Sequence, residues 1–235
     1  PEQYEQEFEC SFDAAVMGAY YGRHMAQATT DKRITGVPYD PTVKVWTAWD
    51  LGIRDAMAIW FAQMVGREIH LIDYYEATGA DLGHYVRELD KRPYTYANDI
   101  LPHDAQAKEL GTGKSRKEFL EGLGRKCDLA PNLRIEDGIE AVRMILPRCW
   151  FDARKCERGI DALKLYRAEY DAKLQNLRPT PVHDWASHAA DAFRYLAVTI
   201  DRTIDTAGFG RALKEPLPIA TTSSKLRIKY PDTSH

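Results

Sequence analysis

The sequence predicts an α/β fold with a central mixed sheet flanked by helices, and two observations support this prediction. Three apolar runs with strand character follow one another closely, at residues 43–49, 57–65 and 68–75. Gly66-Arg67 separates the last two runs, so we expect at least that pair to form an antiparallel hairpin. Later segments alternate between helical and strand-like patterns, which is typical of further strands added to a sheet through crossover helices.

The chain before the first strand reads as a helical or irregular lead-in that extends to about residue 40. Its apolar residues have near-helical spacing, at Phe8, Phe12, Ala15, Val16 and Tyr20. Pro38-Tyr39-Asp40-Pro41 then breaks the pattern, so we expect a linker there.

Helix and strand signals continue in order after the hairpin. Residues 81–91 place four apolar side chains on one helical face, and residues 94–102 read as a fourth strand. Ser115 is expected to cap a helix over residues 116–123, because Glu118 stands three positions later and completes a capping box.

The C-terminal half is expected to be mostly helical. Residues 133–135 read as a short fifth strand, Asp137 as the cap of a helix ending at Leu146, and residues 152–174 as another helix. Asp184 is expected to open the last helix, whose core stripe consists of Trp185, Ala189, Phe193, Leu196 and Ile200.

Length and composition predict one domain with appendages. The 235 residues, 44% of them hydrophobic, can bury a substantial core. We expect an intracellular protein without a membrane segment, because no apolar run approaches ~18 residues and the N-terminus lacks a signal-peptide pattern. The four cysteines have no CxxC spacing, which predicts reduced thiols. A chain that starts at Pro1 is expected to be part of a longer protein.

The net charge of −3 argues against an evenly basic protein that coats DNA. Charge can still be local, and basic residues outnumber acidic ones in residues 108–126 and 211–235. These stretches either lie along nucleic-acid phosphates or form solvated surface and a frayed terminus.

Three aspartates are the strongest functional signal. Asp50 and Asp104 end two strand-like runs, and Asp191 lies in a helical pattern. Carboxylates brought together repel one another unless a cation lies between them, and carboxylate ligands suit Mg²⁺ or Mn²⁺. Hydrolysis of a phosphodiester by two metal ions needs such a cluster. The trio therefore predicts a metal-dependent nuclease with Asp50, Asp104 and Asp191 as ligands of two ions.

Three further polar residues are accessory candidates. Asp55 either reaches the same metal through water or is an ordinary turn residue. Asp184, His188 and Asp191 have i, i+4, i+7 spacing and share one helical face. That face is either solvated or forms the far wall of a metal cleft, in which His188 or Asp184 would order water or a phosphate oxygen.

A glycine-rich basic loop precedes the helix at residue 116. Gly113-Lys114-Ser115 resembles the end of a P-loop, but Lys108 stands where that pattern needs glycine, so an ATPase is disfavoured. The loop either holds DNA phosphate through Lys114, Ser115, Arg116 and Lys117 or is a simple flexible turn.

Several of these segments together resemble the C-terminal nuclease domain of a tailed-phage terminase large subunit. The matching segments are residues 5–12, Trp49-Asp50-Leu51-Gly52 with Asp55, Pro102-His103-Asp104-Ala105, residues 110–116, and residues 183–195. The resemblance implies an RNase H-like fold and an endonuclease that cuts concatemeric viral DNA during packaging. It also implies that the acidic metal ligands fall on Asp50, Asp104 and Asp191, with Asp184 in an accessory position.

The resemblance further implies a domain plan and a set of partners. Residues 1–40 would be the end of the packaging motor and its linker, residues 41–205 the nuclease domain, and residues 206–235 a flexible basic tail. This chain lacks the motor's Walker motifs, so no ATPase activity is expected from it. The expected partners are double-stranded DNA, the ATPase domain of the same polypeptide, the portal protein and the terminase small subunit, in the host cell cytoplasm.

Two alternatives remain open at this point. A resolvase or recombinase would share the fold and the metal chemistry, and would show a preference for DNA junctions or strand transfer. A docking module for DNA or the portal would bind without cutting.

Overall fold

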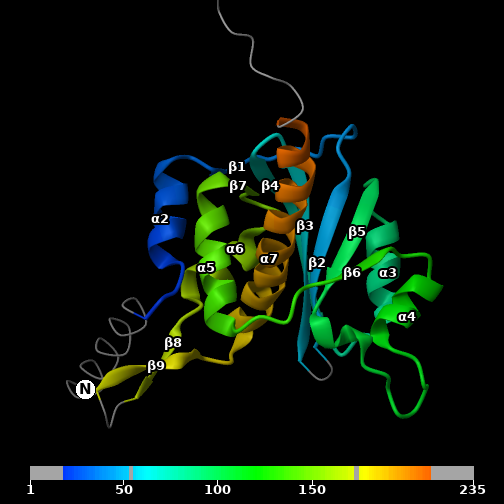
Figure 1. Ribbon diagram of the computed structural model, residues 1–235. Helices are drawn as coiled ribbons and strands as arrows, with labels where there is room; N and C mark the ends of the chain where they lie inside the picture. Colours follow the sequence, from blue (N-terminus) through cyan, green and yellow to red (C-terminus); the bar gives the residue numbers. More distant parts are fainter. Residues whose placement is uncertain (1–17, 53–54, 172–174, 213–235) are drawn as a thin grey trace, which may run out of the picture. The chain divides into compact units, whose positions relative to one another are not determined.

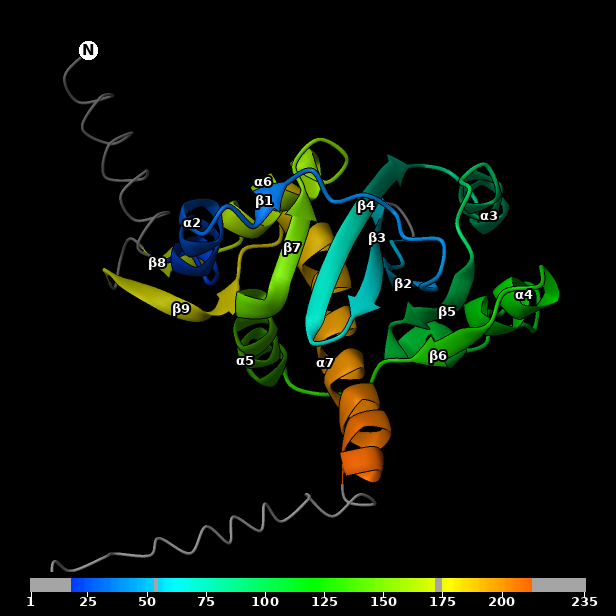
Figure 2. The ribbon, with the colours of Figure 1, turned by 90° about the horizontal axis from the view of Figure 1, so that it is seen from above.

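A seven-stranded mixed sheet is the centre of the part of the chain that the structure describes. The structure is a computed structural model, and it describes residues 18–52, 55–171 and 175–212. The strand order is β1-β7-β4-β3-β2-β5-β6 (Figures 1 and 2). The three antiparallel strands at its middle are β2 (Val45–Asp50), β3 (Ala56–Val65) and β4 (Glu68–Thr78). Gly66 takes a positive φ of 61° in the β3–β4 turn, which confirms the predicted hairpin.

Parallel strands extend this antiparallel centre on both sides. β5 (Tyr96–Leu101) pairs with β2, and β6 (Cys127–Leu129) pairs with β5. On the other side β7 (Cys149–Asp152) pairs with β4, and β1 (Ile34–Thr35) pairs with β7. The predicted class, a mixed sheet with three antiparallel strands and parallel additions, is therefore confirmed.

Helices flank the sheet (Figure 1). One apolar cluster joins the sheet to α3 (Leu82–Asp90) and α4 (Arg116–Gly122), through side chains such as Tyr85, Leu89 and Leu120. The other face carries α6 (Glu157–Leu165) and α7 (Trp185–Ala212), beside α5 (Ile135–Ile145). α2 (Gly22–Thr30) packs on α6. The hairpin of β8 (Ala168–Asp171) and β9 (Asn176–Pro181) is a separate two-stranded sheet.

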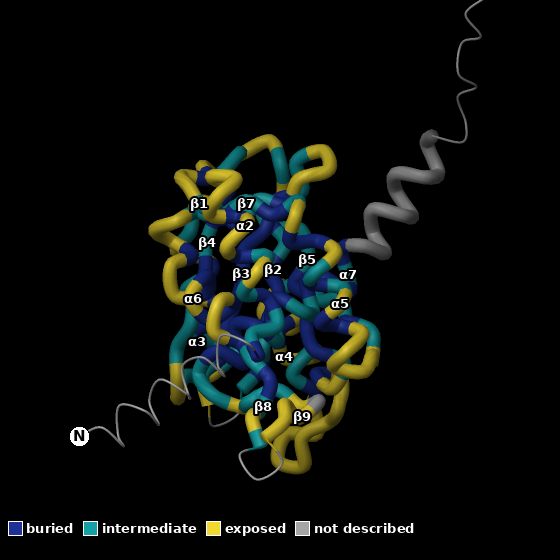
Figure 3. Tube along the Cα trace, turned by 90° about the vertical axis from the view of Figure 1, so that its left-hand side faces the viewer, coloured by how far each residue is buried: buried dark blue, intermediate teal, exposed yellow. Residues whose placement is uncertain are grey.

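Trp60 fixes α7 over the middle of the sheet. Its indole nitrogen Nε1 donates a hydrogen bond of 2.8 Å to the Ala189 carbonyl oxygen, and its ring meets Phe193 edge-on. Trp60 is fully buried, and buried positions follow the central strands (Figure 3). Because Trp60 pairs with Ala48 across the sheet, this contact brings α7 to the face of β2 that also carries Asp50.

Three sequence predictions for the C-terminal half are wrong. Residues 133–135 form no strand, because Ile135 begins α5 and the short strand is β6, which lies along β5. Asp137 lies in the first turn of α5, where its charge suits the helix dipole, and it does not cap the helix. The helix predicted over 152–174 is α6 alone. It ends before Tyr166, whose backbone is extended, and β8 follows.

Part of the segment predicted as a lead-in, before the expected linker, contributes to the sheet. β1 is an edge strand of the sheet, and α2 packs on α6, so residues 22–35 belong with the elements that follow. Residues 1–17 lie outside the described part, as does most of the predicted tail. The chain divides into two compact units, Pro1–Asp201 and Arg202–His235, and every site discussed below belongs to the first. The predicted boundaries at residues 40 and 205 stay predictions.

None of the helices in the described residues is both long enough and apolar enough to span a lipid bilayer.

Gly159→Ala is expected to destabilise the chain by about 1–3 kcal/mol, although alanine favours helices, because an added methyl group overpacks the core. A Cβ at Gly159 would lie 2.5 Å from Cη2 of Trp60. Gly122→Ala in α4 is the matched control, because nothing lies within 4 Å of a Cβ there. Urea unfolding of both variants checks the prediction, and equal stability of the two would contradict it.

Candidate active site

Parallel pairing of β2 and β5 brings two of the predicted ligands to one edge of the sheet. Val45 pairs with Tyr96 and Ala48 with Ile100, so the two strands end on the same side. Asp50 is the last residue of β2. Asp104 lies in the short 3₁₀ helix η1 (His103–Gln106), directly after β5.

α7 supplies the third predicted ligand and a histidine that contacts Asp50. Nδ1 of His188 lies 3.1 Å from Oδ2 of Asp50. Asp50 is only 18% exposed, and burial raises the pKa of its carboxyl group, with the charge of Asp191 adding to the effect and His188 opposing it. The hydrogen bond with Asp50 raises the pKa of His188 against the effect of burial. At this end of β2, the mostly buried Asp50 is therefore affected by the charge of Asp191 and has His188 as its hydrogen-bond partner.

Tyr195 of α7 is affected by the charges of all three carboxylates. Burial raises the pKa of its hydroxyl to about 12, and the charges of Asp191, Asp50 and Asp104 all add to that shift. Such electrostatic effects require the carboxylates to be near the same group. The charges of Asp50, Asp104 and Asp191 therefore all act on the same tyrosine.

Arginines of the chain hold the other two carboxylates. Nη2 of Arg116 donates to Oδ2 of Asp104 at 3.1 Å, and Nη2 of Arg194 donates to Oδ1 of Asp191 at 2.7 Å. Across residues 18–52, 55–171 and 175–212, no three His, Cys, Asp or Glu side chains stand close enough together to hold a metal ion. The assignment of these aspartates as metal ligands therefore stays a prediction.

The accessory candidates are placed differently from one another. Asp55 is exposed, 3.8 Å from Nε2 of His183, whose ring meets that of His188 edge-on. Asp184 accepts a hydrogen bond from the Ala186 backbone N–H at its Oδ1 and from Arg167 at its Oδ2. The first contact is typical of a helix N-cap, so Asp184 anchors the start of α7, whereas His188 contacts a predicted ligand directly.

Asp184→Ala is expected to cost about 1 kcal/mol of stability through the lost cap, with little change in DNA cleavage. His188→Ala is expected to slow cleavage by roughly 10- to 100-fold, because it removes the group that orients Asp50. Asp184→Asn is the control, since asparagine caps a helix as well as aspartate does. Cleavage rates and melting temperatures are measured together. Lost cleavage in a fully stable Asp184→Ala variant would show instead that Asp184 acts in the site.

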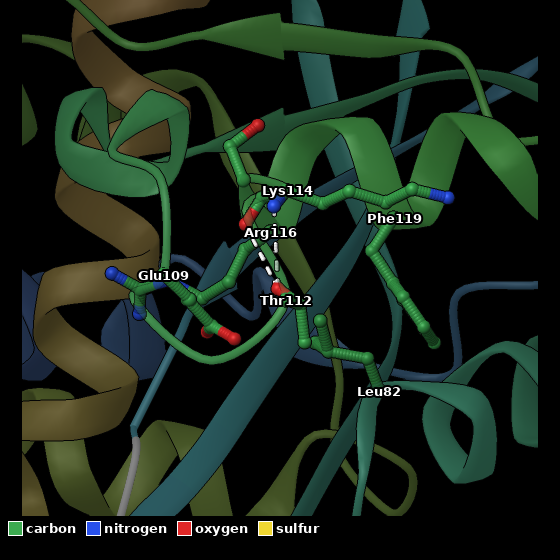
Figure 4. Close-up of a pocket in the computed structure, with 7 residues that line it drawn as sticks. Leu82, Glu109, Thr112, Lys114, Arg116 and Phe119 are labelled. Atoms are coloured by element: carbon green, nitrogen blue, oxygen red, sulfur yellow. Dashed lines mark hydrogen bonds between the residues drawn. The ribbon is translucent and has the colours of Figure 1, made fainter.

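The four candidates for DNA contact differ in the contacts they make within the chain. Ser115 and Glu118 form the predicted capping box, so the Ser115 N–H is bound to the Glu118 carboxylate. Lys117 pairs with Glu121 at 2.6 Å. Arg116 is turned to Asp104, and Lys114 lines a pocket of ≈ 500 Å³ with Leu82 and Phe119 (Figure 4). A role of these residues in DNA binding stays a prediction.

Sequence reasoning missed Arg194 and Tyr195. Arg194 follows Asp191 by three residues on α7, a spacing that signals an ion pair on one helical face. Its aliphatic stem fills the space beside Gly138 of α5, where an added Cβ would lie 2.4 Å from Cδ of Arg194. The absence of a side chain at Gly138 therefore gives Arg194 its place beside Asp191.

Comparison with known proteins finds likeness in structure alone. No protein-family model and no curated protein matches the chain. A large terminase from a thermophilic bacteriophage is similar over 73% of this chain and 43% of its own, with 18% identity and a TM-score of 0.59. The P22 large terminase nuclease domain is similar over 72% of this chain and 89% of its own, with 18% identity and a TM-score of 0.55. The large terminase nuclease of thermophilic phage G20c is similar over 79% of this chain and 98% of its own, with 14% identity and a TM-score of 0.51.

These likenesses establish the fold. The chain spans less than half the length of the first of these proteins, and nearly the full length of the P22 and G20c nuclease domains. The mixed sheet with flanking helices is thus the RNase H-like fold of large terminase nuclease domains, as the sequence resemblance implied.

Proposed function

We propose that this chain is the nuclease part of a terminase large subunit: a metal-dependent endonuclease that cleaves concatemeric viral double-stranded DNA during genome packaging. The observation that supports the proposal is the placement of Asp50 and Asp104 after the neighbouring parallel strands β2 and β5, with His188 of α7, three residues before Asp191, in contact with Asp50. The fold shared with large terminase nuclease domains supports the same activity.

The donor set fits a hard divalent cation. Asp50 is a mostly buried acid whose pKa is raised by burial and by a second acid, Asp191, so added positive charge nearby would be favourable. Oxygen ligands from carboxylates suit Mg²⁺ or Mn²⁺. Two such ions, when bound, would generate the nucleophile from water at neutral pH and stabilise the charge on the departing 3′ oxygen.

The chain's own residues have separate roles in this proposal. Asp50, Asp104 and Asp191 hold the ions. His188 orients Asp50 through the 3.1 Å contact, and Arg194 orients Asp191 through the 2.7 Å contact. Lys114 and Lys117 supply positive charge beside the DNA path, where phosphate contacts fix the position of the duplex without reading its sequence.

The proposed partners follow from the packaging role. The chain would be joined to a packaging ATPase domain in the same polypeptide and would act with the portal protein and the terminase small subunit, in the host cell cytoplasm. The similarity to the large terminase of the thermophilic bacteriophage covers 43% of that longer chain, which supports the presence of a further domain in the whole protein.

A plasmid assay tests the proposed function. Supercoiled plasmid incubated with the chain and Mg²⁺ or Mn²⁺ should become nicked and then linear, and a chelator should prevent both products. Preference for four-way junctions over plain duplex would favour a resolvase instead. DNA binding without any cutting, at every metal concentration, would favour a docking module.

A further inference from the structure

Arg116 connects the two chain segments that carry Asp50 and Asp104. Its Nη1 donates a hydrogen bond of 3.0 Å to the carbonyl oxygen of Leu51, the residue after Asp50. Its Nη2 donates to Oδ2 of Asp104 at 3.1 Å. The Arg116 side chain is 14% exposed, whereas Asp104 is 56% exposed. A largely desolvated guanidinium thus fixes a carboxylate that is open to solvent.

The glycine-rich loop before α4 is built as a turn that places Arg116. The Glu109 N–H donates to the Lys114 carbonyl and the Gly113 N–H to the Glu109 carbonyl, while Gly113 takes a φ of 67°. Thr112 Oγ1 contacts the Lys114 backbone (Figure 4). The Ser115–Glu118 capping box follows. These contacts close the loop on itself and set Arg116 as the first residue of α4.

The side chains of Arg116 and Lys114 extend in different directions, although both residues line the pocket of Figure 4. The Arg116 guanidinium and the Lys114 ammonium extend from opposite sides of the loop in Figure 4. The guanidinium of Arg116 donates hydrogen bonds to two acceptors within the chain. Arg116 therefore contacts the candidate site, whereas Lys114 is exposed to solvent.

We infer that Arg116 is a positioning residue, which fixes Asp104 relative to the segment after Asp50, and that the glycine-rich loop exists to hold it there. The consequence for catalysis rests on the proposed function. An isolated ion pair to an exposed carboxylate contributes little, but a planar guanidinium that bonds two acceptors at once has a fixed orientation. Lysine carries the charge without this fork, so it cannot replace arginine fully.

The test compares Arg116→Ala, Arg116→Lys and a control, Arg134→Ala. Arg134 makes a similar two-contact pair with Asp137, but its side chain is 80% exposed and lies outside the site. Three quantities are measured: hydrogen–deuterium exchange of peptides containing Leu51 and Asp104, plasmid cleavage across Mn²⁺ concentrations, and DNA affinity across salt concentrations.

The inference expects Arg116→Ala to speed exchange in both peptides, to lower kcat by roughly 10- to 100-fold and to raise the Mn²⁺ concentration needed for half-maximal cleavage. Arg116→Lys should recover part of the rate, and DNA affinity should keep its salt dependence. Unchanged exchange in the two peptides would overturn the inference. So would a salt slope reduced by about one with kcat unchanged, which would show a phosphate contact.

The exchange measurement separates this inference from the proposed function. If the unmodified chain fails to cut DNA with any metal, the proposed function fails, and the exchange of the two peptides still decides whether Arg116 holds them. If Arg116→Ala unfolds, Arg116→Lys gives the same comparison in a variant that keeps the charge.

Discussion

Asp191→Asn is expected to reduce DNA cleavage by at least about 100-fold while the chain stays folded, because it removes one of the charges that we propose as metal ligands. Asparagine keeps the shape of the side chain. Asp191 is partly exposed, and its contact inside the chain is the ion pair with Arg194. The effect on stability should therefore be small, and the loss should appear in kcat. Asp50→Asn and Asp104→Asn are expected to have the same effect.

The three variants differ in which other contact of the carboxylate they weaken. Asp50→Asn weakens the contact with His188, and Asp104→Asn weakens the contact with Arg116. The control is Asp161→Asn, an exposed carboxylate of α6 paired with Lys164. Plasmid nicking by each variant is measured beside its melting temperature. Near-normal nicking by a folded Asp191→Asn protein would remove Asp191 from the ligand set.

Local signals in the sequence predicted the elements that carry these residues. The β3–β4 hairpin follows from one glycine between two apolar runs, and the capping box at α4 from Ser115 and Glu118 alone. Asp50 and Asp104 could be placed at strand ends because each follows an apolar run directly. Their common edge then follows once the strands pair in parallel.

The individual contacts of Arg116 and His188 could not be predicted in the same way. Arg116 and Leu51 are 65 residues apart, and His188 and Asp50 are 138 apart, so no periodic pattern relates them. The sequence alone left Arg116 either as a phosphate contact or as part of a simple flexible turn. The structure instead shows a guanidinium with two acceptors inside the chain, which only the tertiary packing could reveal.

Short strands were missed for a related reason. β6 has three residues and β1 has two, and each is stabilised by its neighbour in the sheet. Such pairing leaves almost no signal in the sequence, because side-chain alternation needs a longer run to be recognised. The same limit explains why the helix predicted over 152–174 took in residues that belong to β7 and β8.

A buried ion pair between β5 and the chain after α4 is the second place where a large effect is expected. Asp99 is 1% exposed and receives two hydrogen bonds of 2.7 Å from Arg125, through Nε and Nη2. Thr47 of β2 also donates to Asp99, and Trp49 Nε1 donates to Thr47 in turn. The network crosses from β5 to β2 at the position where Thr47 and Asp99 are paired in the sheet.

Asp99→Asn is expected to destabilise the chain by about 3–5 kcal/mol, because it leaves the guanidinium of Arg125 buried without its counter-charge. Adding Arg125→Met should recover part of the loss, since no unpaired charge then remains. Asp161→Ala, which breaks the exposed pair with Lys164, should cost no more than about 1 kcal/mol. Guanidinium chloride would screen these charges, so urea unfolding is the suitable measurement.

The double variant decides what this network does for the site. Because Thr47 and Asp99 are paired in the register that aligns β2 with β5, a loosened network would let the strand ends carrying Asp50 and Asp104 shift relative to each other. If the network only stabilises the fold, Asp99→Asn with Arg125→Met should cleave DNA normally wherever it is folded. If it also fixes the register, the variant should be slow to cut at temperatures well below its melting point, and Mn²⁺ should restore the rate only in part. An Asp99→Asn protein as stable as the unmodified chain would contradict the central claim, that a desolvated carboxylate balances Arg125.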